Sequence, residues 1–186
     1  KELFTVVNAR QVLALMFHND MADLFDFLGL KGFKRMHEYQ YIEESCMHRK
    51  LKRYYINHHG MLLPNEDVEP VDIIPYDWYQ YNRLAVTPSV RKQAVQRAME
   101  QYKEWETDTK ALYEKSARML LDWGCIADFN EINCLVCDVD SELKHLERLC
   151  IELKAADYDF GYIGMLQEEY HERYKEKCKD VGKILC

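Results

Sequence analysis

Glu142 and His145 form a Glu-x-x-His pair within residues 137–149, CDVDSELKHLERL. Residues three positions apart lie on the same side of an α-helix, so this carboxylate and imidazole could bind one metal ion. In a chain with seven histidines, about one such pair is expected by chance. The pair therefore indicates a metal site only if other helices supply further ligands.

Two other stretches carry charged side chains on faces that are otherwise apolar. In residues 33–55, Glu44 and His48 lie four positions apart on such a face, a spacing that also brings two side chains together. In residues 95–120, Glu106 is the only carboxylate on the apolar face. The amino-terminal stretch differs, because its inner face offers Gln11 and His18 and no glutamate.

Carboxylates and imidazoles on the inner faces of a bundle could not stay unpaired, because burying isolated charge costs many kcal/mol. A pair of divalent ions would remove that cost, and carboxylate oxygens with a few imidazoles suit iron, with manganese as an alternative. Taken singly, each pair is also explained as a solvated or hydrogen-bonded pair. The candidate metal ligands are Glu44, His48, Glu106, Glu142 and His145, with Gln11 and His18 as possible accessory residues.

The elements that position these side chains are predicted to be helices. The 186 residues are 48% hydrophobic and 31% charged with only seven Gly and four Pro, which predicts an all-α fold in a single domain spanning 1–186. We expect helices at about 4–28, 31–58, 89–123, 128–155 and 158–183. The four prolines lie in or beside the connection between the second and third helices, so it is an extended crossover between two antiparallel hairpins.

Charge and cysteine content restrict the partners and the compartment. A formal net charge of -7 disfavours binding to nucleic acid or to an anionic membrane surface. No stretch approaches the roughly 20 apolar residues of a membrane span, and residues 1–20 are expected to form a core helix. An odd number of cysteines, seven, predicts reduced thiols in a cytoplasmic protein.

Three stretches resemble the ferritin and bacterioferritin family. Residues 29–64, GLKGFKRMHEYQYIEESCMHRKLKRYYINHHGMLLP, are similar to its second helix, in which a Glu-Glu doublet precedes a metal-binding His. Residues 71–78, VDIIPYDW, resemble the crossover of bacterial ferritins. Residues 128–149, DFNEINCLVCDVDSELKHLERL, resemble the fourth helix of bacterioferritin, with Glu142 and His145 on its Glu-x-x-His.

This resemblance implies a ferritin-like four-helix bundle with an extra C-terminal helix and a ferroxidase-type activity. Ferrous iron would be oxidised with dioxygen at a di-iron centre, with Glu142 or Glu44 bridging the ions. The resemblance also implies a homo-oligomer, which could be a hollow shell of many subunits that stores iron.

Three features depart from the family pattern. Gln11 stands where the family has a first-helix glutamate, and His18 could compensate. Because Glu44 and His48 are four positions apart rather than three, either a π-bulge inserts one residue or Ser45 occupies the ligand position. The fifth helical stretch, 158–185, is about twice the family's usual length. Both a closed cage and a smaller oligomer therefore stay possible assemblies.

An alternative hypothesis is a metal-free bundle that serves as an interaction or scaffold protein. Glu106 would then pair with His48 or His145 in a buried salt bridge. A third possibility is a di-iron oxidase of an organic substrate. In each case we expect His37 and the doublet 58–59 at the bundle edge or near a helix end.

Overall fold

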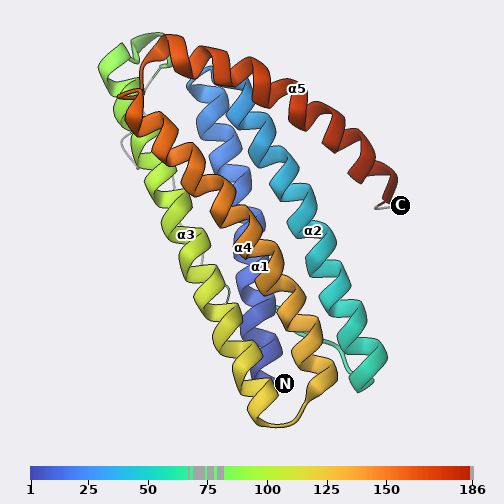
Figure 1. Cartoon of the computed structure of the whole chain (residues 1–186). Helices are drawn as coiled ribbons and strands as arrows, with labels where there is room; N and C mark the ends of the chain where they lie inside the picture. Colours follow the sequence, from blue (N-terminus) through green and yellow to red (C-terminus); the bar gives the residue numbers. More distant parts are fainter. Residues whose placement is uncertain (67, 69–73, 75–77, 79–81, 185–186) are drawn as a thin grey trace.

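The computed structural model describes the backbone of residues 1–66, 68, 74, 78 and 82–184. Within these residues there are five α-helices, one short 3-10 helix and no strand. They are α1 (Glu2–Phe27), α2 (Lys31–His59), η2 (Arg83–Ala85), α3 (Pro88–Asp122), α4 (Ile126–Ala155) and α5 (Phe160–Ile184). Helices α1 to α4 form a four-helix bundle and α5 is the extra C-terminal helix (Figure 1). The all-α prediction is confirmed, and each helix boundary lies within two residues of its predicted place.

Local sequence signals explain where the helices begin and end. Thr87 precedes Pro88, and its side-chain oxygen accepts a hydrogen bond from the Val90 amide at 3.3 Å, which caps the start of α3. Helix α2 ends at Gly60, whose φ of 67° is a left-handed conformation that glycine adopts without a steric penalty.

The two ends of the crossover between α2 and α3 lie near opposite ends of the bundle. At its start, the Asn8 side chain donates to the Pro64 carbonyl at 2.9 Å. At its end, Arg83 donates to the Asp26 carbonyl at 2.7 Å. Asn8 and Asp26 lie near opposite ends of α1, about 27 Å apart at 1.5 Å per helical residue. The two hairpins, α1 with α2 and α3 with α4, are therefore joined by the long connection that the prolines predicted (Figure 1).

Most of the crossover motif at 71–78 lies outside the described residues. Two of its residues are described, Ile74 and Trp78, and both pack against the core. The Trp78 ring lies 6.0 Å from the Phe27 ring at the end of α1.

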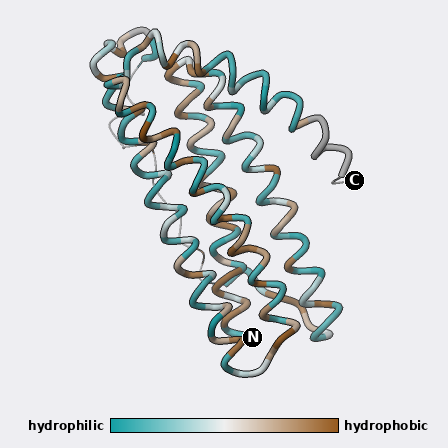
Figure 2. The backbone as a smooth tube through the Cα atoms, in the orientation of Figure 1, coloured by the Kyte–Doolittle hydropathy of each residue, from teal (hydrophilic) through white to brown (hydrophobic). Residues whose placement is uncertain are grey.

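The described core consists of two apolar clusters that follow each other along the bundle axis. One contains Phe17, Phe25 and Phe33 and continues onto α5, and the other contains Phe4 and Tyr55. Apolar and polar residues alternate along every helix (Figure 2), and none of the described helices is apolar enough over a sufficient length to cross a membrane. The six described cysteines are all free.

Helix α5 crosses the end of the bundle and slopes down beside α2, against which it packs (Figure 1). The contact is closest at Gly32, where a Cβ atom would lie only 2.4 Å from the Gln167 backbone oxygen. The Gln167 side-chain oxygen accepts hydrogen bonds from the Gly32 and Phe33 amides at 2.9 and 3.0 Å. Because α2 has no side-chain cap of its own at its N-terminus, α5 satisfies amide groups that would otherwise lack partners.

Replacing Gly32 with Ala should destabilise the fold, because the added methyl group meets α5 backbone that cannot rotate away. We expect a loss of about 1–3 kcal/mol in the free energy of unfolding, as for other overpacked sites, measured by urea denaturation. Gly164→Ala is the matched control, since Gly164 is an exposed helical glycine with open space around its Cβ position. That control should be neutral or stabilising by up to about 1 kcal/mol, and an equal effect of both variants would contradict the close contact.

Candidate metal centre

A layer of polar residues separates the two apolar clusters, and every helix of the bundle contributes to it. In each helix the polar position lies between the last residue of one cluster and the first residue of the other. These positions are Gln11 of α1 between Val7 and Ala14, Glu44 of α2 between Tyr39 and Leu51, Glu106 of α3 between Trp105 and Tyr113, and Glu142 of α4 between Val139 and Leu146.

The pairing of α1 with α2 places Gln11 level with Glu44. On one side of Gln11, the Asn8 side-chain oxygen lies 3.0 Å from His48 Nε2, and on the other the Nδ1 atoms of His18 and His37 are 3.0 Å apart. Counting inward from these contacts along two antiparallel helices brings Gln11 opposite Glu44. Gln11 is 0% exposed, and among the described residues neither polar atom of its side chain has a hydrogen-bond partner.

The three carboxylates of the layer interact electrostatically and resist ionisation. Burial raises the pKa of Glu44 to about 7. Burial, followed by the charge of Glu44, raises the pKa of Glu106 to about 8. The pKa of the half-buried Glu142 is also raised, first by burial and then by the charges of Glu106 and Glu44. Acidic groups whose pKa values are raised by burial and by neighbouring carboxylates form a site whose charged state needs a cation.

Arg10 supplies part of that positive charge, and the sequence analysis did not identify it. Its guanidinium lies 3.4 Å from the centroid of the Trp105 ring and donates to the Thr109 hydroxyl and the Trp105 carbonyl, each at 2.8 Å. The charge of Arg10 lowers the pKa values of both Glu44 and Glu106, although burial dominates in each case. It stabilises the carboxylates through space, because no ion pair joins it to them within the described part of the chain.

A buried imidazole pair lies beside the polar layer. His18 and His37 are each 0% exposed, and His18 Nε2 lies 3.8 Å from a Glu106 carboxylate oxygen. Burial lowers the pKa of His18 to about 3 and the pKa of His37 well below 6.5, so both rings are neutral. The prediction that His37 lies at the bundle edge was wrong. The sequence does place His37 on the apolar face of α2, and that position indicates burial.

His48 and His145 do not point into the polar layer. His48 is held by Asn8 at the seam of α1 and α2, and His145 Nε2 lies 3.2 Å from the Tyr170 hydroxyl of α5. The proposed salt bridge from Glu106 to either of these histidines is therefore wrong, and the nearest imidazole to Glu106 among the described side chains is His18. Helix α2 is a regular α-helix throughout, so of the two alternatives for the Glu44–His48 spacing the π-bulge is wrong, and the placement of Ser45 in the ligand position stays a prediction.

The chemistry of the layer fits iron, because three helices contribute carboxylates at this level and, among the described residues, the Gln11 amide and the Nε2 atoms of His18 and His37 have no hydrogen-bond partner. Over the described residues, however, no group of three or more His, Cys, Asp and Glu side chains is arranged to hold a metal ion. Metal binding would require side-chain rotation toward a common centre. The assignment of the five predicted ligands and of Gln11 and His18 stays a prediction.

Comparison with solved structures supports the architecture over nearly the whole chain. An open pore ferritin from the hyperthermophilic archaeon Archaeoglobus fulgidus matches with a TM-score of 0.74 and 18% identity, over 91% of this chain and 93% of that one. A humanized archaeal ferritin matches with a TM-score of 0.71 and 20% identity, over 92% and 96% of the two chains. The chain has a ferritin-like fold.

A closed form engineered from the Archaeoglobus fulgidus ferritin matches this ferritin-like chain with a TM-score of 0.69 and 19% identity, over 92% of this chain and 96% of that one. No family model and no curated protein sequence matches. The likeness therefore rests on how the helices are arranged, and at this level of identity it establishes the fold alone.

Replacing Glu106 with Gln should stabilise the metal-free protein at alkaline pH. Because the folded-state pKa is raised to about 8 from 4.5, the stability contributed by the protonated carboxyl is complete below pH 4.5 and is lost as the pH rises through 8. The amide never ionises, so we expect the variant to exceed the wild type by at least about 1 kcal/mol in unfolding free energy near pH 9.

Urea denaturation at acidic and alkaline pH measures this difference. The matched control is Glu104→Gln, which changes an exposed carboxylate on the same helix and should leave the pH dependence unaltered. A variant E106Q that is less stable than the wild type near pH 9 would show that the Glu106 charge is well compensated in the metal-free protein.

Proposed function

We propose that this ferritin-like chain binds ferrous iron in the polar layer between its two apolar clusters and oxidises it with dioxygen. One observation carries the proposal: each of the four bundle helices replaces an apolar core position with Gln or Glu at the same level of the bundle. Such a layer is costly in a core that could have been apolar throughout. The cost is offset when a cation binds there.

In this proposal iron is the substrate, and Glu44, Glu106 and Glu142 are its principal ligands. Their raised pKa values mean that binding displaces protons, so iron binding should strengthen as the pH rises. Each ferrous ion gives one electron to dioxygen. Gln11 and His18 complete one side of the centre, and His48 and His145 join it only if their rings leave Asn8 and Tyr170.

The protein residues around the centre have three supporting roles. Arg10 limits the repulsion between Glu44 and Glu106 before iron arrives. The Gln40 amide donates to the Tyr102 hydroxyl at 3.1 Å and orients that ring next to the carboxylates. The apolar clusters above and below the layer exclude bulk water from its two buried carboxylates, Glu44 and Glu106. Homo-oligomer formation and iron storage are part of the same proposal, which the ferritin-like fold favours.

A second candidate is the metal-free interaction or scaffold protein. It is favoured by the lack of a preformed three-ligand group in the described residues and by Gln11, which is neutral where the resemblance implies a carboxylate. In that case the raised pKa values favour the protonated, uncharged carboxyls, and the layer needs no cation. The two candidates differ in how they respond to iron and to loss of a single carboxylate.

Replacing Glu142 with Ala should abolish oxidation of ferrous iron, because it removes the carboxylate that interacts with both Glu106 and Glu44. The rate is measured by absorbance of the ferric product after anaerobically loaded protein meets dioxygen. Glu152→Ala removes an exposed carboxylate from the same helix and should retain the wild-type rate. Equal rates for E142A and wild type would remove Glu142 from the site.

Native mass spectrometry before and after anaerobic addition of ferrous iron separates the candidates directly. Two irons per chain in a large closed oligomer would support storage, and two irons on a monomer or dimer would support an oxidase. If no iron binds, the metal-free interaction or scaffold protein is the remaining candidate.

Replacing Gln11 with Glu should tighten iron binding, because it adds a carboxylate opposite Glu44 in the polar layer. Without iron the variant should be less stable than the wild type near pH 8, since a fourth acidic group is buried there. Anaerobic ferrous iron should then raise its melting temperature more than it raises that of the wild type. Gln96→Glu, on the exposed face of α3, is the control and should show neither effect. An unchanged response to iron in Q11E would place Gln11 outside the site.

A further inference from the structure

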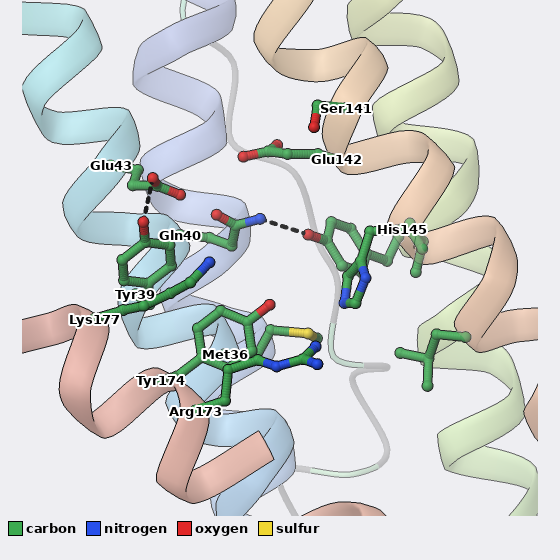
Figure 3. Close-up of a pocket in the computed structure, with 13 residues that line it drawn as sticks. Met36, Tyr39, Gln40, Glu43, Ser141, Glu142, His145, Arg173, Tyr174 and Lys177 are labelled. Atoms are coloured by element: carbon green, nitrogen blue, oxygen red, sulfur yellow. Dashed lines mark hydrogen bonds between the residues drawn. The ribbon is translucent and has the colours of Figure 1, made fainter. Parts of the chain in front are cut away.

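A cavity of about 330 Å³ lies between α2, α4 and α5 and opens to the surface (Figure 3). Its apolar wall is formed by Met36, Leu146 and Leu149, and the Tyr102 and Tyr174 rings also line it. This volume lies at the lower end of the range of about 300–1,000 Å³ that is typical of small-molecule sites. The cavity exists because α5 is long enough to extend beside α2.

One buried polar atom lining this cavity lacks a partner. Gln40 is 6% exposed, and its amide nitrogen donates to the Tyr102 hydroxyl while its carbonyl oxygen has no hydrogen-bond partner among the described residues. A buried acceptor of this kind costs free energy unless a donor reaches it. A hydroxyl group on a bound molecule would supply that donor.

Two cationic side chains of α5 line the cavity, one helical turn apart. Arg173 lies over the Tyr170 ring, 5.5 Å from its centroid, and contacts Glu169 at 3.3 Å. Lys177 Nζ lies 5.0 Å from the Tyr39 ring centroid and 5.2 Å from that of Tyr174. These cations and the aromatic rings beside them are suited to the carboxylate and the ring of an aromatic acid.

The carboxylates of the facing helices interact with only one of these two cationic side chains. Glu43 of α2 accepts a hydrogen bond from the Tyr39 hydroxyl and interacts with Lys177. Glu142 of α4 receives a hydrogen bond from Gln40. Arg173 faces neither of these carboxylates, and its acidic partner is the exposed Glu169 of its own helix. The α5 side of the cavity is therefore the side that attracts an anion.

We propose that this cavity binds a small aromatic hydroxy acid, with its carboxylate at Arg173 and Lys177 and its hydroxyl donating to the Gln40 carbonyl oxygen. The ring would lie against Met36 and Leu149. Binding needs no iron, so it is separate from the proposed oxidation. Because Glu142 also lines the cavity, the bound acid would lie next to the polar layer.

The test is isothermal titration calorimetry of the metal-free, full-length chain with 4-hydroxybenzoate as the probe. We expect one molecule bound per chain. Benzoate, which lacks the hydroxyl, should bind roughly fivefold more weakly because Gln40 is left without a donor. 4-Hydroxybenzamide, which lacks the charge, should bind roughly tenfold more weakly. Absence of 4-hydroxybenzoate binding at millimolar concentration would overturn the proposal.

Variants of α5 locate the site. Arg173→Gln and Lys177→Gln should each weaken 4-hydroxybenzoate binding roughly fivefold or more, and both change exposed side chains whose loss leaves the helix intact. Lys175→Gln is the matched control, because Lys175 is an exposed lysine of the same helix that pairs with Glu172 and does not line the cavity. Binding that is equally strong in R173Q, K177Q and K175Q would place the acid elsewhere and overturn the proposal.

Discussion

The placement of the buried Glu44 and Glu106 and the half-buried Glu142 at one level of a helical bundle is the constraint on which the rest of the structure depends. Burial is the main cause that raises the pKa of all three, the charge of Glu44 raises the pKa values of Glu106 and Glu142, and the charge of Glu106 raises that of Glu142. An apolar core cannot surround such a group without a compensating cation or proton. The apolar residues therefore divide into two clusters, with the polar layer between them.

The topology brings the polar positions of the four helices to that one level. The crossover starts beside Asn8 and ends beside Asp26, so it spans α1 and lets α3 run parallel to α2 (Figure 1). Each antiparallel hairpin then aligns its own pair of polar residues. The same fold of the helices is found in solved ferritins at 18–20% identity, so the fold tolerates extensive change in sequence.

Helix α5 changes what the bundle alone would present. Gln167 caps the start of α2, and the Tyr170 hydroxyl engages His145, which would otherwise be free to approach Glu142. The same helix closes one side of the cavity that Arg173 lines. One element thus stabilises the fold, holds a candidate metal ligand through Tyr170 and closes a separate cavity, all because it packs along α2 rather than ending at the bundle tip.

The sequence by itself determined the five helices, the crossover and the three inward carboxylates. Those features depend on local signals, such as Pro88 and Gly60, and on the 3.6-residue period that sets which face is apolar. Only the tertiary structure decided what the imidazoles contact. Each residue turns the helix by about 100°, so His48 and His145 sit at the rim of the inner face, where the neighbouring helix determines their partners. The apolar face of α2 already indicated that His37 is buried, but only the packing of α1 on α2 decided that its partner is His18.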